Sequence, residues 1–112
     1  MSITLTSFGY RNGDVASPAT LTVDCRRLSN PHGHPQLREL TGRDKRVQTF
    51  VETDPKFPGV YREALKAAQN GNHIAFGCFG GRHRSVAMVE IIARALLVTG
   101  QSVTIVHRDL AA

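Results

Sequence analysis

The segment HIAFGCFGGRHRS, residues 73–85, decides the fold, because it joins an apolar strand to a helix through a glycine-rich loop. The run from His73 to Phe76 is typical of a buried strand that ends at Gly77. A helix is expected from about His83 to Val98, where apolar residues recur at three- and four-residue spacing until Gly100 ends it. A strand that leads directly into such a helix indicates an α/β fold.

The flanking segments predict three more strands and two more helices. Strands are expected at Ile3–Gly9, Thr20–Cys25 and Val103–Val106, where apolar residues alternate with polar ones. One helix is expected to start at Thr41–Asp44 and another to run from about Pro58 to Asn70. The order strand, strand, helix, helix, strand, helix, strand predicts a single α/β domain over residues 1–112. We expect a mostly parallel, Rossmann-like sheet of about four strands with flanking helices and right-handed crossovers.

Between the second strand and the first helix lies Ser29-Asn30-Pro31-His32-Gly33-His34-Pro35. Two prolines and a glycine argue against both a helix and a strand, so this stretch is expected to be an irregular loop.

The composition favours an anionic partner and a cytoplasmic location. The 112 residues include 14 Lys and Arg against 9 Asp and Glu, a formal net charge of +5. This charge fits nucleic acid or a phosphorylated small molecule, although dispersed charge on a solvated surface explains it equally well. Cys25 and Cys78 are too few for a disulfide framework, and no apolar stretch resembles a signal peptide or a membrane span. We expect no membrane partner.

The loop from Gly77 to Ser85 has the composition of an anion site. Its glycines allow backbone N–H groups to point inward, and the following helix presents unpaired amides and the positive end of its dipole. Arg82 and Arg84 add charged donors, and Ser85 is expected to cap the helix or to contact the ligand. We favour a phosphate site over a plain glycine-rich turn with a capping serine.

The same loop leaves an enzymatic alternative open. Cys78 and Arg84-Ser85 form a Cys-x5-Arg-Ser pattern, which is similar to that of cysteine-dependent phosphatases. In that chemistry a thiolate attacks phosphorus, an arginine holds the phosphate oxygens and an acid protonates the leaving alcohol. Asp24 is the candidate acid, although an ion pair with Arg26 explains its position equally well. No metal site is predicted, because no Cys-x2-Cys or His-x3-His pair is present, and no cofactor is expected.

Several segments together resemble the C-terminal domain of the RNase adapter protein RapZ family. The pairing of Asn30-Pro31-His32 with the loop Gly77 to Val86 is specific, and the resemblance spans nearly the whole chain. The other segments that carry it are Ser7-Phe8-Gly9-Tyr10, Asp24-Cys25-Arg26, Leu37-Arg38, Leu40 to Asp44 and His107-Arg108-Asp109-Leu110.

The resemblance implies a fold similar to a phosphofructokinase subdomain and a non-enzymatic role. The family is expected to sense the amino-sugar phosphate glucosamine-6-phosphate and to bind small RNA as an adapter. The phosphosugar pocket that it implies comprises Asp24, Asn30, His32, Cys78, Gly80, Gly81 and Arg84. The loop chemistry and the charged strand end add Arg26, Phe79, Arg82, His83 and Ser85 to the predicted ligand-binding residues.

Three departures from the family pattern matter. The sequence contains no Walker motif, so by this resemblance we expect it to correspond to the C-terminal part of such proteins, without the nucleotide-binding part. Phe79 stands where the family has a small hydroxyl residue, which is expected to reshape the pocket. The end Asp109-Leu110-Ala111-Ala112 lacks a basic tail, which weakens the RNA prediction more than the phosphate prediction. A structural or homo-oligomerising module, or one that contacts a protein partner, remains a further alternative.

Overall fold

The described part of the chain, residues 2–13 and 21–110 of a computed structural model, forms a four-stranded sheet in the order β2-β3-β1-β4. The strands are β1 (Ser2–Gly9), β2 (Leu21–Asp24), β3 (His73–Cys78) and β4 (Ser102–His107). Every neighbouring pair is parallel, which confirms the predicted α/β architecture. Thr20, the predicted start of the second strand, lies outside the described residues.

The predicted helices are also present. They are α2 (Lys45–Glu52), α3 (Phe57–Asn70) and α4 (Arg84–Val98). The Asp44 side chain caps α2 by accepting from the Arg46 amide. Three short 3-10 helices follow strand ends or loops: η1 (Tyr10–Asn12), η2 (Cys25–Arg27) and η3 (Pro31–Gly33).

The prediction of an irregular loop over residues 29–35 was wrong in part. Pro31–Gly33 forms η3, and Pro35 begins the short helix α1 (Pro35–Arg38). Both prolines occupy a first-turn position, where the missing N–H costs nothing. The Asn30 side chain caps η3 by accepting from the His32 amide at 3.1 Å. The prolines therefore start helical turns here instead of preventing them.

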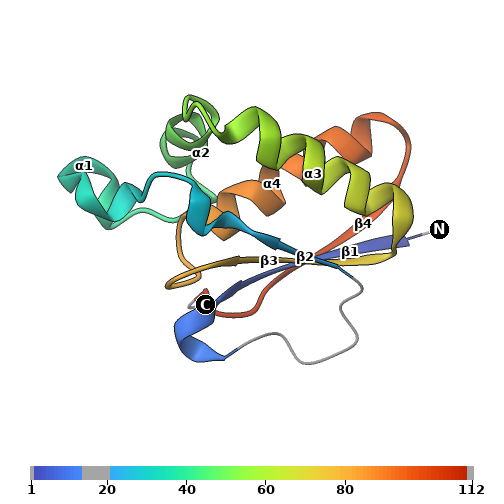
Figure 1. Cartoon of the computed structure of the whole chain (residues 1–112), viewed down its shortest axis with the longest axis horizontal. Helices are drawn as coiled ribbons and strands as arrows, with labels where there is room; N and C mark the ends of the chain where they lie inside the picture. Colours follow the sequence, from blue (N-terminus) through green and yellow to red (C-terminus); the bar gives the residue numbers. More distant parts are fainter. Residues whose placement is uncertain (1, 14–20, 111–112) are drawn as a thin grey trace.

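The larger helices α2, α3 and α4 all lie on one face of the sheet (Figure 1). The chain crosses from β2 to β3 through α3 and from β3 over β1 to β4 through α4. Both crossovers move in the same direction across the sheet, so a common handedness places both helices on the same face. No helix within residues 2–13 and 21–110 is long and apolar enough to cross a membrane.

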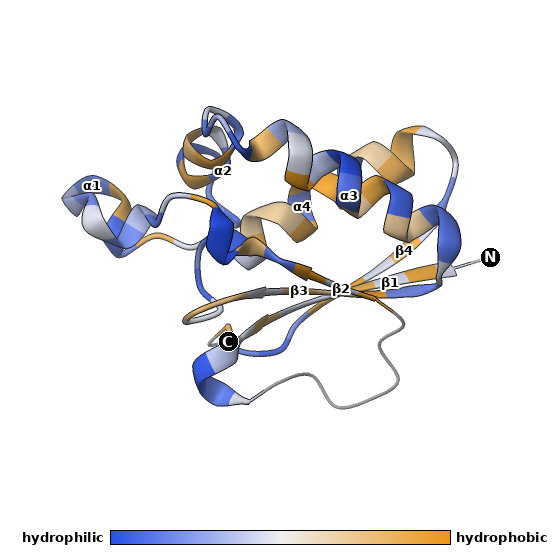
Figure 2. Ribbon diagram, in the orientation of Figure 1, coloured by the Kyte–Doolittle hydropathy of each residue, from blue (hydrophilic) through white to orange (hydrophobic). Residues whose placement is uncertain are grey.

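The core lies between this face and the helices α2, α3 and α4. Leu5, Phe76 and Ile92 are among its fully buried side chains. α4 is buried over most of its surface, and Figure 2 shows it as predominantly hydrophobic, whereas α3 is hydrophilic on part of its surface. Because α4 packs on the centre of the sheet, its first turn is held firmly beside the carboxyl end of β3. This packing positions the loop between the two.

Candidate functional site

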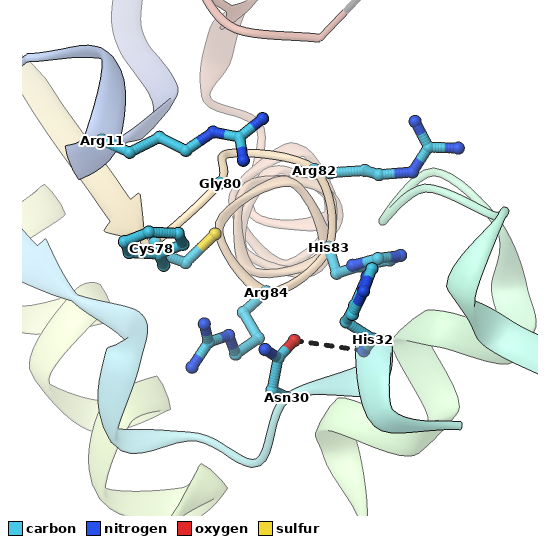
Figure 3. Close-up of a pocket in the computed structure, with 9 residues that line it drawn as sticks. Arg11, Asn30, His32, Cys78, Gly80, Arg82, His83 and Arg84 are labelled. Atoms are coloured by element: carbon cyan, nitrogen blue, oxygen red, sulfur yellow. Dashed lines mark hydrogen bonds between the residues drawn. The ribbon is translucent and has the colours of Figure 1, made fainter. Parts of the chain in front are cut away.

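A cavity of about 370 Å³ opens where β1, β2 and β3 end and α4 begins. This is the edge at which parallel α/β sheets bind ligands. Figure 3 shows the labelled side chains arranged around the start of α4. The lining residues are Arg11, Asn30, His32, Cys78, Phe79, Gly80, Arg82, His83 and Arg84. All of them except Arg11 are among the residues predicted from the sequence.

The glycine-rich loop is held by close backbone contacts. Gly81 has a φ of +74°, a conformation that residues with a Cβ rarely adopt. On the other side of α4, a Cβ on Gly42 would lie 2.2 Å from the amide nitrogen of Ala87. The Gly42 amide also donates to the Arg82 carbonyl at 2.9 Å. The backbone around the first turn of α4 is therefore fixed from both sides.

The first amides of α4 belong to Arg84, Ser85 and Val86. Because no helical turn precedes them, α4 supplies no carbonyls to accept from these N–H groups. The N-cap residue is His83, whose side chain makes no capping hydrogen bond. Ser85 does not cap the helix, because its hydroxyl lies 3.1 Å from the sulfur of Cys78 inside the protein. The positive end of the helix dipole thus lies at the cavity.

Arg84 lies at the bottom of the cavity with only 7% of its surface exposed. Its Nη1 donates to the carbonyl oxygens of Leu28 (3.1 Å) and Arg26 (3.3 Å). Its Nε is buried and has no hydrogen-bond partner among the described residues. A buried charged donor without a partner is costly, so Arg84 carries an uncompensated donor directly below the cavity. We call Cys78 and Arg84 the pocket floor.

His83 and Arg82 carry out structural roles beside the cavity. Burial lowers the pKa of His83, so its ring is neutral at pH 7. Its Nε2 lies 3.1 Å from the carbonyl oxygen of Arg38, which only accepts, so the ring donates through Nε2. The guanidinium of Arg82 donates to the carbonyls of Glu39 and Leu40. The two side chains tie the loop after α1 to the start of α4.

Asp24 and Arg26, both predicted to contact ligand, form an ion pair with 2.7 Å between Asp24 Oδ2 and Arg26 Nη2. This is the ion pair that the sequence suggested. The hydrogen bond from Arg26 lowers the pKa of Asp24. The guanidinium of Arg26 also lies 3.8 Å from the centre of the Tyr10 ring. Neither residue is among those that line the cavity, and neither are Gly81 and Ser85. Direct contact of these four with a ligand remains a prediction.

Arg11, His32 and Phe79 form the outer edge of the cavity, which we call the pocket rim. All three are exposed, and 58% of the Phe79 surface is accessible. The amide of Arg11 donates to the Phe79 carbonyl at 3.1 Å. Sequence reasoning missed Arg11, although its place just after β1, at the carboxyl edge of a parallel sheet, could have indicated it.

The described ranges contain no group of three or more His, Cys, Asp or Glu side chains arranged to hold a metal ion. The polar groups at the cavity are instead amides, guanidinium groups and imidazoles. This set of donors suits an anion.

Comparisons with known proteins show which family of sequences this chain resembles. A nucleotide-binding protein of Ruegeria sp. (strain TM1040) is 40% identical over 98% of this chain and 40% of its own length. Nucleotide-binding proteins of Novosphingobium aromaticivorans and Acidiphilium cryptum are 44% and 40% identical over 97% and 98% of this chain. The chain spans about 40% of the length of these relatives. Residues 1–111 match the family described as the RapZ C-terminal domain. The chain therefore belongs to the RapZ C-terminal domain family.

Proposed function

We propose that the domain binds the phosphate group of a small phosphorylated molecule without turning it over. The observation that carries this proposal is the largely buried guanidinium of Arg84 at the pocket floor, beside the first amides of α4. Helix N-termini and guanidinium groups both bind phosphate, and here they meet in one cavity.

The ligand class that the family resemblance suggests is a sugar phosphate such as glucosamine-6-phosphate, which the domain would sense. A cavity of about 370 Å³ lies within the range of ligand pockets, at the small end. The relatives' description as nucleotide-binding proteins is also compatible with a phosphorylated ligand. Ligand binding at Arg82 would change the position of the Glu39–Leu40 segment, because the Arg82 guanidinium donates to both of its carbonyls. A partner that contacts this segment would then detect the bound ligand.

Thermal unfolding with inorganic phosphate, glucosamine-6-phosphate and other sugar phosphates tests the proposal. A ligand present at 100 times its dissociation constant should add about 2.7 kcal/mol to the free energy of unfolding. Arg84→Met should abolish the shift, whereas Arg62→Met, which removes an equal charge from the exposed side of α3, should preserve it. A panel without any shift, or a shift that Arg84→Met leaves intact, would contradict the proposal.

A cysteine-dependent phosphatase is the second candidate, favoured by the Cys78–Ser85 contact at the pocket floor. The Ser85 hydroxyl could stabilise a Cys78 thiolate by donating to it. Against this, the ion pair with Arg26 keeps Asp24 ionised at neutral pH, so Asp24 has no proton to give to a leaving group. Phosphatase activity would hydrolyse an aryl phosphate, be blocked by vanadate and vanish in Cys78→Ser. Turnover retained in Cys78→Ser would eliminate it.

RNA binding by an adapter domain is the remaining function that the resemblance suggests. Arg11 and Arg82 lie at the cavity and could contact backbone phosphates from its outer side. If such contacts form, a plot of the logarithm of the association constant against the logarithm of the salt concentration has a negative slope. Each phosphate contacted on a single strand contributes about −0.7 to that slope. A mobility-shift titration over several salt concentrations measures this slope, and binding that is independent of salt would exclude this mode.

A further inference from the structure

The pocket rim carries an aromatic side chain that the phosphate site does not need. Phe79 is one of the most exposed large apolar residues of the described chain, and it lies directly between Cys78 and Gly80 of the loop. Its backbone carbonyl is fixed by the Arg11 amide. Arg11 and Arg82 line the same cavity, and exposed aromatic rings in cationic surroundings are the combination that stacks nucleic-acid bases.

The depth of the cavity separates this ring from the phosphate site. At the pocket floor Cys78 and Arg84 are 2% and 7% exposed, whereas 58% of Phe79 is exposed at the rim. A ligand that contacts both must carry its phosphate inward and its planar group outward, with a spacer between them. A ribose between phosphate and base is such a spacer.

The lining offers little to a free sugar at the rim. Among residues 2–13 and 21–110, none of those that line the cavity is a carboxylate. Asn30, the only lining side-chain amide, uses its oxygen to accept from the His32 amide. The nearby carboxylate of Asp24 is occupied by Arg26. Hydroxyl groups, those of a ribose included, therefore find few side-chain acceptors here, and a planar base would add contacts with Phe79 and the side chain of Arg11.

We propose that the pocket takes a nucleoside 5′-monophosphate group, with the phosphate at Arg84 and the start of α4 and the base stacked on Phe79. This proposal rests on the proposed phosphate-binding function and names the ligand class of that site. The group can be a free nucleotide or the 5′-phosphorylated end of an RNA, which present the same chemistry.

Calorimetric titration at fixed ionic strength tests the stacking. Adenosine 5′-monophosphate and ribose 5-phosphate share their phosphate and sugar and differ in the base. The nucleotide should bind about 5- to 150-fold more tightly, the range for one stacked base. Phe79→Ala should remove this preference and change the affinity for ribose 5-phosphate by less than about twofold. Phe79→Tyr should restore the preference, and Leu97→Ala, an exposed apolar residue near the end of α4, should leave it unchanged.

Equal affinity for the two ligands, or an equal loss of both in Phe79→Ala, would overturn the nucleotide assignment but leave phosphate binding intact. Tighter binding of glucosamine-6-phosphate than of the nucleotide would overturn it in the same way. Phenyl phosphate has no spacer, so its affinity should be the same in wild type and in Phe79→Ala. If Phe79→Ala weakens phenyl phosphate as much as it weakens the nucleotide, the inference that a spacer is needed between phosphate and ring is wrong. If neither ligand nor inorganic phosphate binds, both proposals fail.

A second pair of probes distinguishes a free nucleotide from the 5′-phosphorylated end of an RNA as the ligand. A short single-stranded RNA with a 5′-phosphate is compared with the same RNA with a 5′-hydroxyl, in wild type and in Phe79→Ala. An RNA end as ligand predicts that the 5′-phosphate tightens binding and that Phe79→Ala cancels the gain. A free nucleotide as ligand predicts that adenosine 5′-monophosphate binds more tightly than the phosphorylated RNA.

Discussion

The pocket floor and the pocket rim meet at adjacent residues, Cys78 and Phe79, yet they differ in how much of the fold depends on them. Arg84 at the floor is buried and holds the carbonyls of Arg26 and Leu28. Phe79 at the rim is exposed, and its backbone carbonyl accepts from the Arg11 amide. Substitutions at the floor are therefore expected to change both the stability of the fold and ligand binding, whereas substitutions at the rim should change only which ligand is preferred.

The largest expected effect comes from the backbone that supports the floor. Gly42→Ala would place a Cβ 2.2 Å from the amide nitrogen of Ala87, so the Gly42 loop or the start of α4 must shift. We expect the free energy of unfolding to fall by about 3 kcal/mol, with loss of phosphate binding. Urea denaturation measures the change. Gly33→Ala is the matched control, because a Cβ there meets nothing within 4 Å, and its effect should stay within about 0.5 kcal/mol.

Arg84→Lys tests whether the floor needs a guanidinium or only a charge. Lysine keeps the charge but loses Nε and the planar fork, so it cannot hold both the carbonyls and an anion. The affinity for inorganic phosphate should fall about tenfold or more, as for the loss of a hydrogen bond to a charged group. Titration calorimetry compares it with Arg62→Lys on the exposed surface of α3. Unchanged affinity in Arg84→Lys would show that the floor acts through charge alone.

The order of strands and helices was predictable because each element repeats its own hydrophobic period. The loop between β3 and α4 was predictable because glycine, arginine and serine follow an apolar run. The position of β1 between β3 and β4 was not predictable from the sequence, because it depends on contacts between distant segments.

Within the site, the sequence identified residue types better than their partners. It placed His83 at the anion site, and His83 does line the cavity, but nothing in the sequence indicated that burial lowers its pKa or that its ring N–H donates to the Arg38 carbonyl. It named Ser85 as a possible cap, whereas the hydroxyl turns inward to Cys78. Arg11 was missed although its place just after β1 indicates the carboxyl edge of the sheet; its contact with Phe79 depends on folding.

An intermediate effect is expected where the end of β1 is held beside the loop. Asp109 Oδ2 accepts from the Gly9 amide at 2.6 Å and pairs with Arg108. Partial burial raises the pKa of Asp109, but the hydrogen bonds from Arg108 and Gly9 outweigh it, and the pKa is lowered on balance. A lowered pKa means that the carboxylate stabilises the fold above its ordinary pKa of about 3.9 and that this contribution is lost as pH falls through the folded-state value.

Asp109→Asn should therefore cost about 1.5 kcal/mol at pH 7, the lower end for hydrogen bonds to a charged group. The difference between variant and wild type should shrink below pH 4, as the wild-type carboxylate becomes protonated. Urea denaturation between pH 7 and pH 3 measures both. A difference that stays constant over this range would show that the Asp109 charge contributes nothing.

The smallest effect on stability is expected at the rim. Phe79→Ala and Arg11→Met should each change the free energy of unfolding by no more than about 0.5 kcal/mol, because both side chains are exposed and the Arg11–Phe79 hydrogen bond joins backbone atoms that neither substitution removes. Urea denaturation of these two variants and of Arg84→Met compares the loss of unfolding free energy at the rim with that at the floor. If Phe79→Ala costs more than about 1 kcal/mol, the ring packs on the fold. If Phe79→Ala leaves the free energy of unfolding unchanged but alters the ligand preference, the ring contributes to ligand binding and not to the stability of the fold.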